Sequence, residues 1–284
     1  MAEAFAAFAD RIFLIPRGLS GSVATRYPMA FQRETATIYA QLADDQSLVS
    51  GMCRRDFELT TADGSTLRGT MVGLVGTDPD ARGRGHASRI LAEIENDCRL
   101  DRRDFLVLWS KNHTFFEGLG WVRAGHSLFG EIELRSSLFA PDCVHRSPLD
   151  AENIGAAERI RRELGHQIVN RPKEAWFTRP MQCDQVELLL TDHAYVLLGH
   201  AATGPSVLFE MIGDESAFES LWSAVASTPG SLFLNVTLNG PSQGWLEAAG
   251  ITLSPTRLAH WKKLRAFAEG VLFEDFDIPF FDRV

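Results

Sequence analysis

The stretch VGTDPDARGRGHASRILAEIE, from Val75 to Glu95, passes from one kind of local pattern to another. The apolar run that leads into it, from Met71 to Val75, predicts a β-strand, and from Ala87 onward apolar residues recur at helical spacing. A proline and two glycines lie between the two elements and break regular structure. The stretch therefore predicts a strand, a glycine-rich turn and a helix.

Such a turn suits an anionic ligand. Its backbone N–H groups point at whatever lies above the helix N-terminus, which carries a partial positive charge. Gly83 and Gly85 let a ligand approach the backbone closely, and Arg82 and Arg84 add positive charge. A pyrophosphate is the group that fits these properties best.

The composition narrows the class of protein. The chain has 284 residues, of which 45% are hydrophobic and 23% charged, as in soluble globular proteins. No apolar run approaches the roughly 18 residues of a membrane span, and acids stand near the N-terminus where a signal peptide has Lys or Arg. We therefore expect no membrane partner and a cytoplasmic location. Four widely spaced cysteines without a CxxC pair predict reduced thiols and no metal site.

The charge balance bears on partners. A net charge of −9 argues against nucleic acid and is compatible with a cationic substrate. The charge is uneven, because residues 1–140 carry a net −2 and the remainder carries −7. The basic residues gather around the glycine-rich turn.

The order of predicted elements occurs twice along the chain. The first copy comprises strands at Ala36–Leu42, Leu48–Leu59 and Leu67–Val75, a helix at Ala87–Arg99, a strand at Phe105–Trp109, a short helix at Thr114–Leu119 and a closing strand at Trp121–Glu133. The second comprises a leading helix at Asn153–Leu164, strands at Val186–Leu190, Ala194–His200 and Val207–Met211, a helix at Glu215–Ala226, a strand at Leu232–Leu238, a short helix at Gln243–Ala249 and a closing strand at about Thr256–Leu264.

We interpret the repetition as a tandem duplication with a boundary near Pro141–Pro148. This predicts domains over residues 1–140 and 141–270, followed by an aromatic and acidic tail over 271–284. The second copy has only IGDES between its strand and helix, without a glycine cluster or an arginine. We therefore expect the second domain to be unable to hold a pyrophosphate.

The first copy resembles the GCN5-related N-acetyltransferase (GNAT) superfamily. Its acetyl-CoA signature is an Arg or Gln, two residues, Gly, one residue, then Gly or Ala, which matches Arg82 to Ala87 here. LVLWS and FFEGLGW downstream are similar to the family's later strand and helix, so the resemblance covers roughly Leu48–Glu133. The tandem layout with a degenerate second copy is similar to bacterial acetyltransferases of the enhanced intracellular survival type.

The resemblance implies an α/β fold of two tandem GNAT-like domains, each a mixed, mainly antiparallel sheet flanked by helices. It also implies that acetyl-CoA binds through the backbone of the strand before the turn and through the turn's amides. The residues it assigns to the cofactor are Val75, Gly76, Thr77, Arg82, Gly83, Arg84, Gly85, His86, Ala87, Asn112 and Phe116. Arg84 could equally be a solvated charge, and we expect His86 to be a surface residue or a phosphate neighbour rather than a base.

Phe116 stands where the family often has a tyrosine that protonates the departing CoA thiolate. Phenylalanine cannot donate a proton, so another group or water must act, the reaction must proceed without an acid, or the domain binds CoA without turnover. The resemblance thus leaves the proton donor open.

The base that deprotonates the amine is also open. Asp56 and Glu58 alternate with Phe57 and share one face of a strand, and Glu34 follows a segment that could cover an acceptor pocket. His113, beside the predicted short helix, is a further candidate. By resemblance to the survival-type enzymes, Val284 at the C-terminus or nearby Asp282 could reach the pocket. Each of these residues could instead be an ordinary surface or packing residue.

We expect an acyltransferase that moves the acetyl group of acetyl-CoA to a primary amine, by direct attack on the thioester. The amine is expected to be small and cationic, and the protein could form a homo-oligomer. Two alternatives remain: a CoA-binding sensor or scaffold without turnover, and a protein-interaction module.

Overall fold

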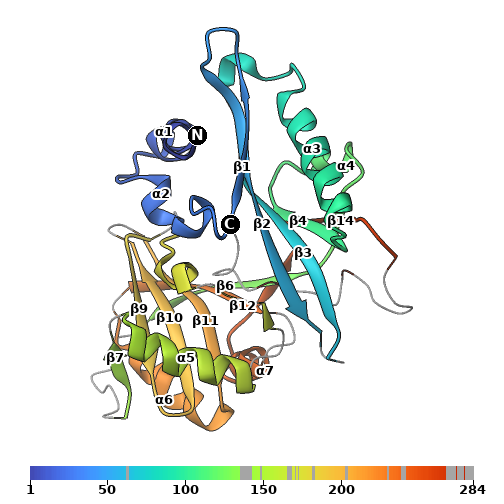
Figure 1. Cartoon of the computed structure of the whole chain (residues 1–284). Helices are drawn as coiled ribbons and strands as arrows, with labels where there is room; N and C mark the ends of the chain where they lie inside the picture. The colour runs from blue at the N-terminus through green and yellow to red at the C-terminus, as the bar shows by residue number, and fades with distance from the viewer. Residues whose placement is uncertain are drawn as a thin grey trace.

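The chain folds into two β-sheets flanked by helices, as the computed structural model in Figure 1 shows. The structure describes all residues except 62–63, 135–142, 148, 165–167, 170, 172, 181–182, 202–203, 229, 238–240, 267–272, 274–277 and 279–284. Each sheet is mixed and mainly antiparallel, with one parallel contact, β3–β4 in the first and β11–β12 in the second. This confirms the expected tandem α/β fold.

The first sheet has seven strands in the order β1-β2-β3-β4-β14-β5, with β8 paired to β2. Their bounds are β1 Thr37–Leu42, β2 Leu48–Thr60, β3 Thr66–Thr77, β4 Phe105–Trp109, β5 Val122–Arg123, β8 Ile168–Val169 and β14 Ala259–Lys263. The second sheet also has seven, in the order β13-β6-β12-β11-β10-β9-β7. Their bounds are β6 Ser127–Leu134, β7 His145–Ser147, β9 Gln185–Leu190, β10 Ala194–His200, β11 Ser206–Gly213, β12 Gly230–Thr237 and β13 Ser254–Thr256.

The two halves exchange strands. We expected Trp121–Glu133 and Thr256–Leu264 each to close the sheet of its own half, and this expectation was wrong. β6 leaves the first half and pairs along its length with β12, whereas β14 returns from the second half to lie between β4 and β5. Gly125, with φ 73°, lies at the bend where the chain leaves β5. Each sheet is thus built from both halves, and the boundary expected near residue 141 falls among the undescribed residues and stays a proposal.

Trp261 on β14 shows how tightly the exchanged strand is held. Its side chain is 1% exposed, and its indole Nε1 donates to the carbonyl of Ala124 at 2.9 Å. Its ring lies 5.3 Å from that of Phe105 on the neighbouring strand β4. The core of the first sheet therefore depends on a residue from the far end of the chain.

Helices cover both sheets. Their bounds are α1 Ala2–Ala9, α2 Val23–Arg26, α3 His86–Leu100, α4 His113–Glu117, α5 Ala151–Leu164, α6 Glu215–Ala226 and α7 Pro241–Ala248, with short helices η1 Asp10–Leu14, η2 Ile15–Arg17, η3 Pro28–Ala30, η4 Pro79–Ala81 and η5 Lys173–Phe177. Within the described ranges, no helix is long and apolar enough to cross a bilayer.

Helix α3 packs on the first sheet with the face that the sequence predicts. Ile90, Leu91, Ile94 and Cys98 are buried and join Leu106 of β4 in one apolar cluster. Each of these aliphatic side chains contributes about 1.5–3 kcal/mol through burial. This packing fixes the position of the helix N-terminus relative to β3 and β4.

Candidate active site

The parallel strands β3 and β4 separate after three residue pairs, which run from Gly69–Phe105 to Met71–Val107. Beyond Met71, β3 continues to Thr77 beside β2. Two residues of β3, Leu74 and Val75, stand opposite a single residue of β2, and Leu74 adopts a positive φ of 51°. This bulge bends β3 away from β4. The parted strands leave a backbone edge that faces a groove.

The groove has a volume of about 950 Å³ and extends from the parted strands to the start of α3. Ten of the eleven predicted cofactor residues line it: Val75, Gly76, Thr77, Arg82, Gly83, Gly85, His86, Ala87, Asn112 and Phe116. Arg84 does not line the groove and is exposed, although its carbonyl accepts a hydrogen bond from Arg89.

The N-terminus of α3 opens onto the groove without a side-chain cap. Its N-cap is Gly85, with φ 77°, and Gly83 has a φ of 76°. A Cβ atom at either glycine would meet nothing within 4 Å, so both backbones border open space. The first-turn amides of α3 therefore remain available to an anion. Nδ1 of His86, also in this turn, is buried and has no partner among the described residues.

The opposite wall comes from the end of β4 and from α4. Trp109, Ser110, Asn112, Phe115 and Phe116 line it. The backbone N–H of Asn112 donates to Oγ of Ser110 at 3.0 Å, which shapes the turn into α4. The Phe116 side chain is 4% exposed because it packs edge-on against Trp121.

Part of the groove is formed by the N-terminal segment, which the sequence reading missed. Ile12, Phe13, Arg17 and Tyr27 line the groove from helix η1, which is a π-helix, and from the residues that follow it. Ile12 and Phe13 lie about 3.5 Å from where a Cβ of Gly76 would stand, so this glycine lets the segment pack on β3. Apolar residues at Phe5, Phe8 and Ile12 carry the helical spacing that could have revealed it.

The sequence of the half that carries the groove matches a known family model. Residues 4–124 match the model of the acetyltransferase (GNAT) domain. They end at Ala124, just before β6 crosses to the second sheet. Residues 4–124 form a GNAT domain.

Solved structures extend the likeness in fold to most of the chain. A probable N-acyltransferase from Enterococcus faecalis V583 aligns with a TM-score of 0.70 at 16% identity, covering 92% of this chain and 69% of its own. Eis1 from Mycobacterium abscessus aligns with a TM-score of 0.65 at 14% identity, covering 92% and 70%. A tandem GNAT protein from the clavulanic acid biosynthesis pathway aligns at 0.51 and 9% identity, covering 92% and 94%. No sequence among the curated proteins matches significantly.

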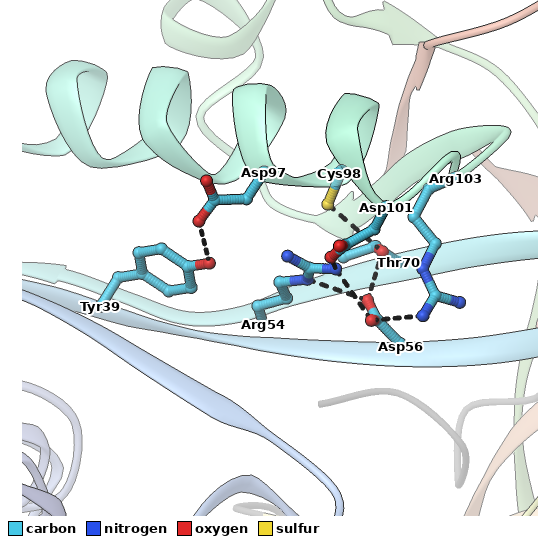
Figure 2. A network of polar contacts seen from close by, with 8 residues as sticks. All are labelled: Tyr39, Arg54, Asp56, Thr70, Asp97, Cys98, Asp101 and Arg103. Carbon is cyan, nitrogen blue, oxygen red and sulfur yellow. Dashed lines mark hydrogen bonds and ion pairs between the residues drawn. The ribbon is translucent and has the colours of Figure 1, made fainter.

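Asp56 lies in a polar network between the first sheet and the C-terminal end of α3 (Figure 2). Its carboxylate receives a two-pronged ion pair from Arg54 at 2.9 and 3.0 Å, an ion pair from Arg103 at 2.6 Å and a hydrogen bond from the Thr70 hydroxyl at 2.6 Å. Arg54 also pairs with Asp101, which caps the end of α3. The network thus lies about 22 Å, one length of α3, from the glycine turn.

The same network shifts the pKa values of its other members. Burial, with a hydrogen bond to Asp97, raises the pKa of Tyr39 to about 12. The hydrogen bond from Arg54 lowers the pKa of Asp101, and burial raises the pKa of Cys98. These contacts tie α3 to β1 and β2, which favours a structural role for Asp56 over that of a base.

The other candidate bases also lie off the groove. Glu58 is exposed and stands across from Arg68 near the start of β3. Glu34 is exposed and borders a separate cavity of about 320 Å³. Val284 and Asp282 lie outside the described residues. None of the residues described as lining the groove is a carboxylate, and the described part of the chain holds no group of three or more His, Cys, Asp or Glu placed to bind a metal.

Proposed function

We propose that the protein transfers the acetyl group of acetyl-CoA to a small primary amine. The observation that carries the proposal is the continuity of two features: the groove between β3 and β4 runs directly into the uncapped N-terminus of α3. One end suits a pyrophosphate, and the other is an open strand edge long enough to hold an extended amide chain. The family match makes an acyl-CoA the expected ligand class.

The described residues fit such a ligand. Gly83 and Gly85 leave room against the backbone, and Arg82 reaches the groove as a cation. The buried and unpartnered Nδ1 of His86 offers one further polar contact beside the turn. Phosphate oxygens satisfy helix N-terminal amides and arginine together.

The chemistry proposed is direct attack of the amine on the thioester carbonyl. The amine must first lose a proton, because an ammonium has no lone pair. Backbone N–H groups on the free edge of β3 would stabilise the oxyanion that then forms. No cysteine is among the described groove-lining residues, which favours a reaction without an acyl-enzyme intermediate. The cytoplasm is the location we propose, since acetyl-CoA is available there.

The test is thiol release from acetyl-CoA by the full-length protein across a panel of primary amines, with mass spectrometry of the amine. Release of CoA matched by acetylation of one amine class supports the proposal. Tight binding of acetyl-CoA without release across the panel would favour the CoA sensor. Absence of binding would favour an interaction module.

A further inference from the structure

Two histidines from different halves of the chain meet behind the groove wall. His113 begins α4, and His260 lies on the exchanged strand β14. Nδ1 of His113 and Nε2 of His260 are 3.1 Å apart, and the rings stack with centroids 5.1 Å apart. His260 is fully buried, whereas His113 is only partly buried. A buried polar pair of this kind is costly unless its hydrogen bonds are satisfied.

The hydrogen bonds fix how the pair carries protons. Nδ1 of His260 lies 3.1 Å from the carbonyl oxygen of Leu258, which can only accept, so this nitrogen carries a proton. Nε2 of His260 is then unprotonated and accepts a hydrogen bond from Nδ1–H of His113. If the pair binds one more proton, Nε2 of His113 is the nitrogen left to take it, and His113 is the more exposed of the two residues.

The pair lies one layer of side chains behind the groove. His113 and Phe116 are three residues apart on α4 and so share a face. The His260 ring is 5.3 Å from that of Phe116, which lines the groove. Asn112, which precedes His113, also lines it. β3 and β4 part in this region, and the proposed function requires the thioester to bind here.

We propose that the His113–His260 pair donates the proton that the CoA thiolate takes up when the amide forms. This inference rests on the proposed function. The carbon–sulfur bond breaks with its electron pair on sulfur, and Nε2–H of the charged His113 supplies the proton, relayed by solvent because neither histidine lines the groove. The proton that the ammonium substrate loses restores the charge of the pair, so the reaction needs no further reactant.

The electrostatics agree with this direction of transfer. Burial, together with the nearby charge of His113, lowers the pKa of His260, which agrees with its role as the acceptor in the pair. Glu117 on α4 and Arg123 on β5 also act on His260, and these two charges stand 3.9 Å apart and have opposite sign. An imidazolium is in general a stronger acid than a thiol, so proton transfer from a charged histidine to a thiolate is favourable.

The test compares His113→Asn with the wild-type protein in kcat against pH and in affinity for acetyl-CoA. Asparagine keeps an N–H donor for His260 but cannot titrate. His193→Asn, at an exposed histidine in the turn between β9 and β10, is the matched control. The double variant His113→Asn with Phe116→Tyr places a hydroxyl donor on the groove wall next to the altered position.

We expect His113→Asn to lower kcat about tenfold, to keep the acetyl-CoA Kd within about twofold, and to lose the fall of kcat at alkaline pH. Adding Phe116→Tyr should restore most of the rate, which a purely structural role of His113 would not allow. An unchanged kcat and pH profile in His113→Asn, or a loss that Phe116→Tyr does not restore, would overturn the inference. Wild-type protein that releases no thiol with any amine would overturn the proposed function together with it.

Discussion

The two parallel strand pairs of this molecule begin alike and end differently. Both β3–β4 and β11–β12 pair through three residues and then separate. In the first sheet the gap is a groove. In the second, α7 contacts both β11 and β12, and its Leu246 is fully buried in the apolar core together with Leu234 and Met211. The same topology thus yields an open groove in one sheet and packed core in the other.

The helices that connect the two strands of each pair, α3 and α6, also differ at their N-termini. The N-cap of α3 is Gly85, which has no side chain to cap the helix, whereas the N-cap of α6 is Asp214, whose carboxylate accepts a hydrogen bond from the N–H of Ser216 at 3.0 Å. A carboxylate at that place already occupies the site an incoming phosphate would need, and it repels one. The two helix N-termini are therefore distinguished by a few residues at the helix start rather than by the fold.

The largest effect should come from breaking the shared construction of the first sheet. Trp261→Ala, in the exchanged strand, should lower the free energy of unfolding by about 3–5 kcal/mol, because a fully buried indole leaves a cavity between β4 and its neighbours. Urea denaturation measures this. Val122→Ala on adjacent β5, where the side chain is 56% exposed, serves as the control and should change stability by less than about 0.5 kcal/mol. A small loss for Trp261→Ala would mean that β14 is dispensable.

The second prediction concerns a substitution that gives α3 the same N-cap residue type as α6. Gly85→Asp should weaken acetyl-CoA binding at least tenfold, about 1.4 kcal/mol, because a carboxylate would face the phosphates. Gly85→Asn tolerates the same positive φ without the charge and should lose much less. Calorimetric titration of both variants separates charge from backbone strain, and equal losses in the two would argue against the phosphate assignment.

A smaller effect concerns what holds α3 in place. Tyr39→Phe removes the hydrogen bond from the phenol to Asp97 at 2.7 Å and should cost about 1 kcal/mol in urea unfolding. Burial raises the pKa of Tyr39 to about 12, so the folded state favours the neutral phenol. The stabilisation is complete below the unfolded pKa of about 10 and is lost as pH rises towards 12. The variant should lack this alkaline loss, and an identical pH dependence would show that Tyr39 does not contribute to it.

The smallest effect is expected at the start of α6. The hydrogen bond from Ser216 lowers the pKa of Asp214, so its contribution to stability is present above the unfolded value of about 3.8 and is lost as pH falls below it. Asp214→Ala should lower Tm slightly at neutral pH and not at all in strong acid, while acetyl-CoA affinity stays the same. A change in that affinity would place part of the binding site in the second half.

Much of the local structure follows from the sequence. The bounds of β4, β10 and α6 match the predicted Phe105–Trp109, Ala194–His200 and Glu215–Ala226, since apolar spacing and turn residues determine such elements locally. The exchange of β6 and β14 could not be read in this way. Strand periodicity shows which face is buried but not which partner supplies the hydrogen bonds.

The same distinction between local pattern and tertiary pairing applies to the candidate site. The turn from Arg82 to Ala87 was predictable, because its glycines and its place between strand and helix carry the signal in sequence. Asp56 was assigned to the right strand, but its partner Arg103 comes from the residues just beyond α3, and only tertiary packing brings the two together. The pairing of His113 with His260 likewise depends on the strand exchange.

The most direct test of the central claim is the stoichiometry of acetyl-CoA binding to the full-length chain. Titration calorimetry should give one site per chain, and Gly83→Val combined with Gly85→Val should weaken it at least tenfold, about 1.4 kcal/mol. Gly250→Val is the matched control, because Gly250 has a similar φ of 82° and equally open surroundings at the end of α7. One site lost only in the double variant is the predicted result. Two sites, or unchanged affinity in a folded double variant, would contradict the account.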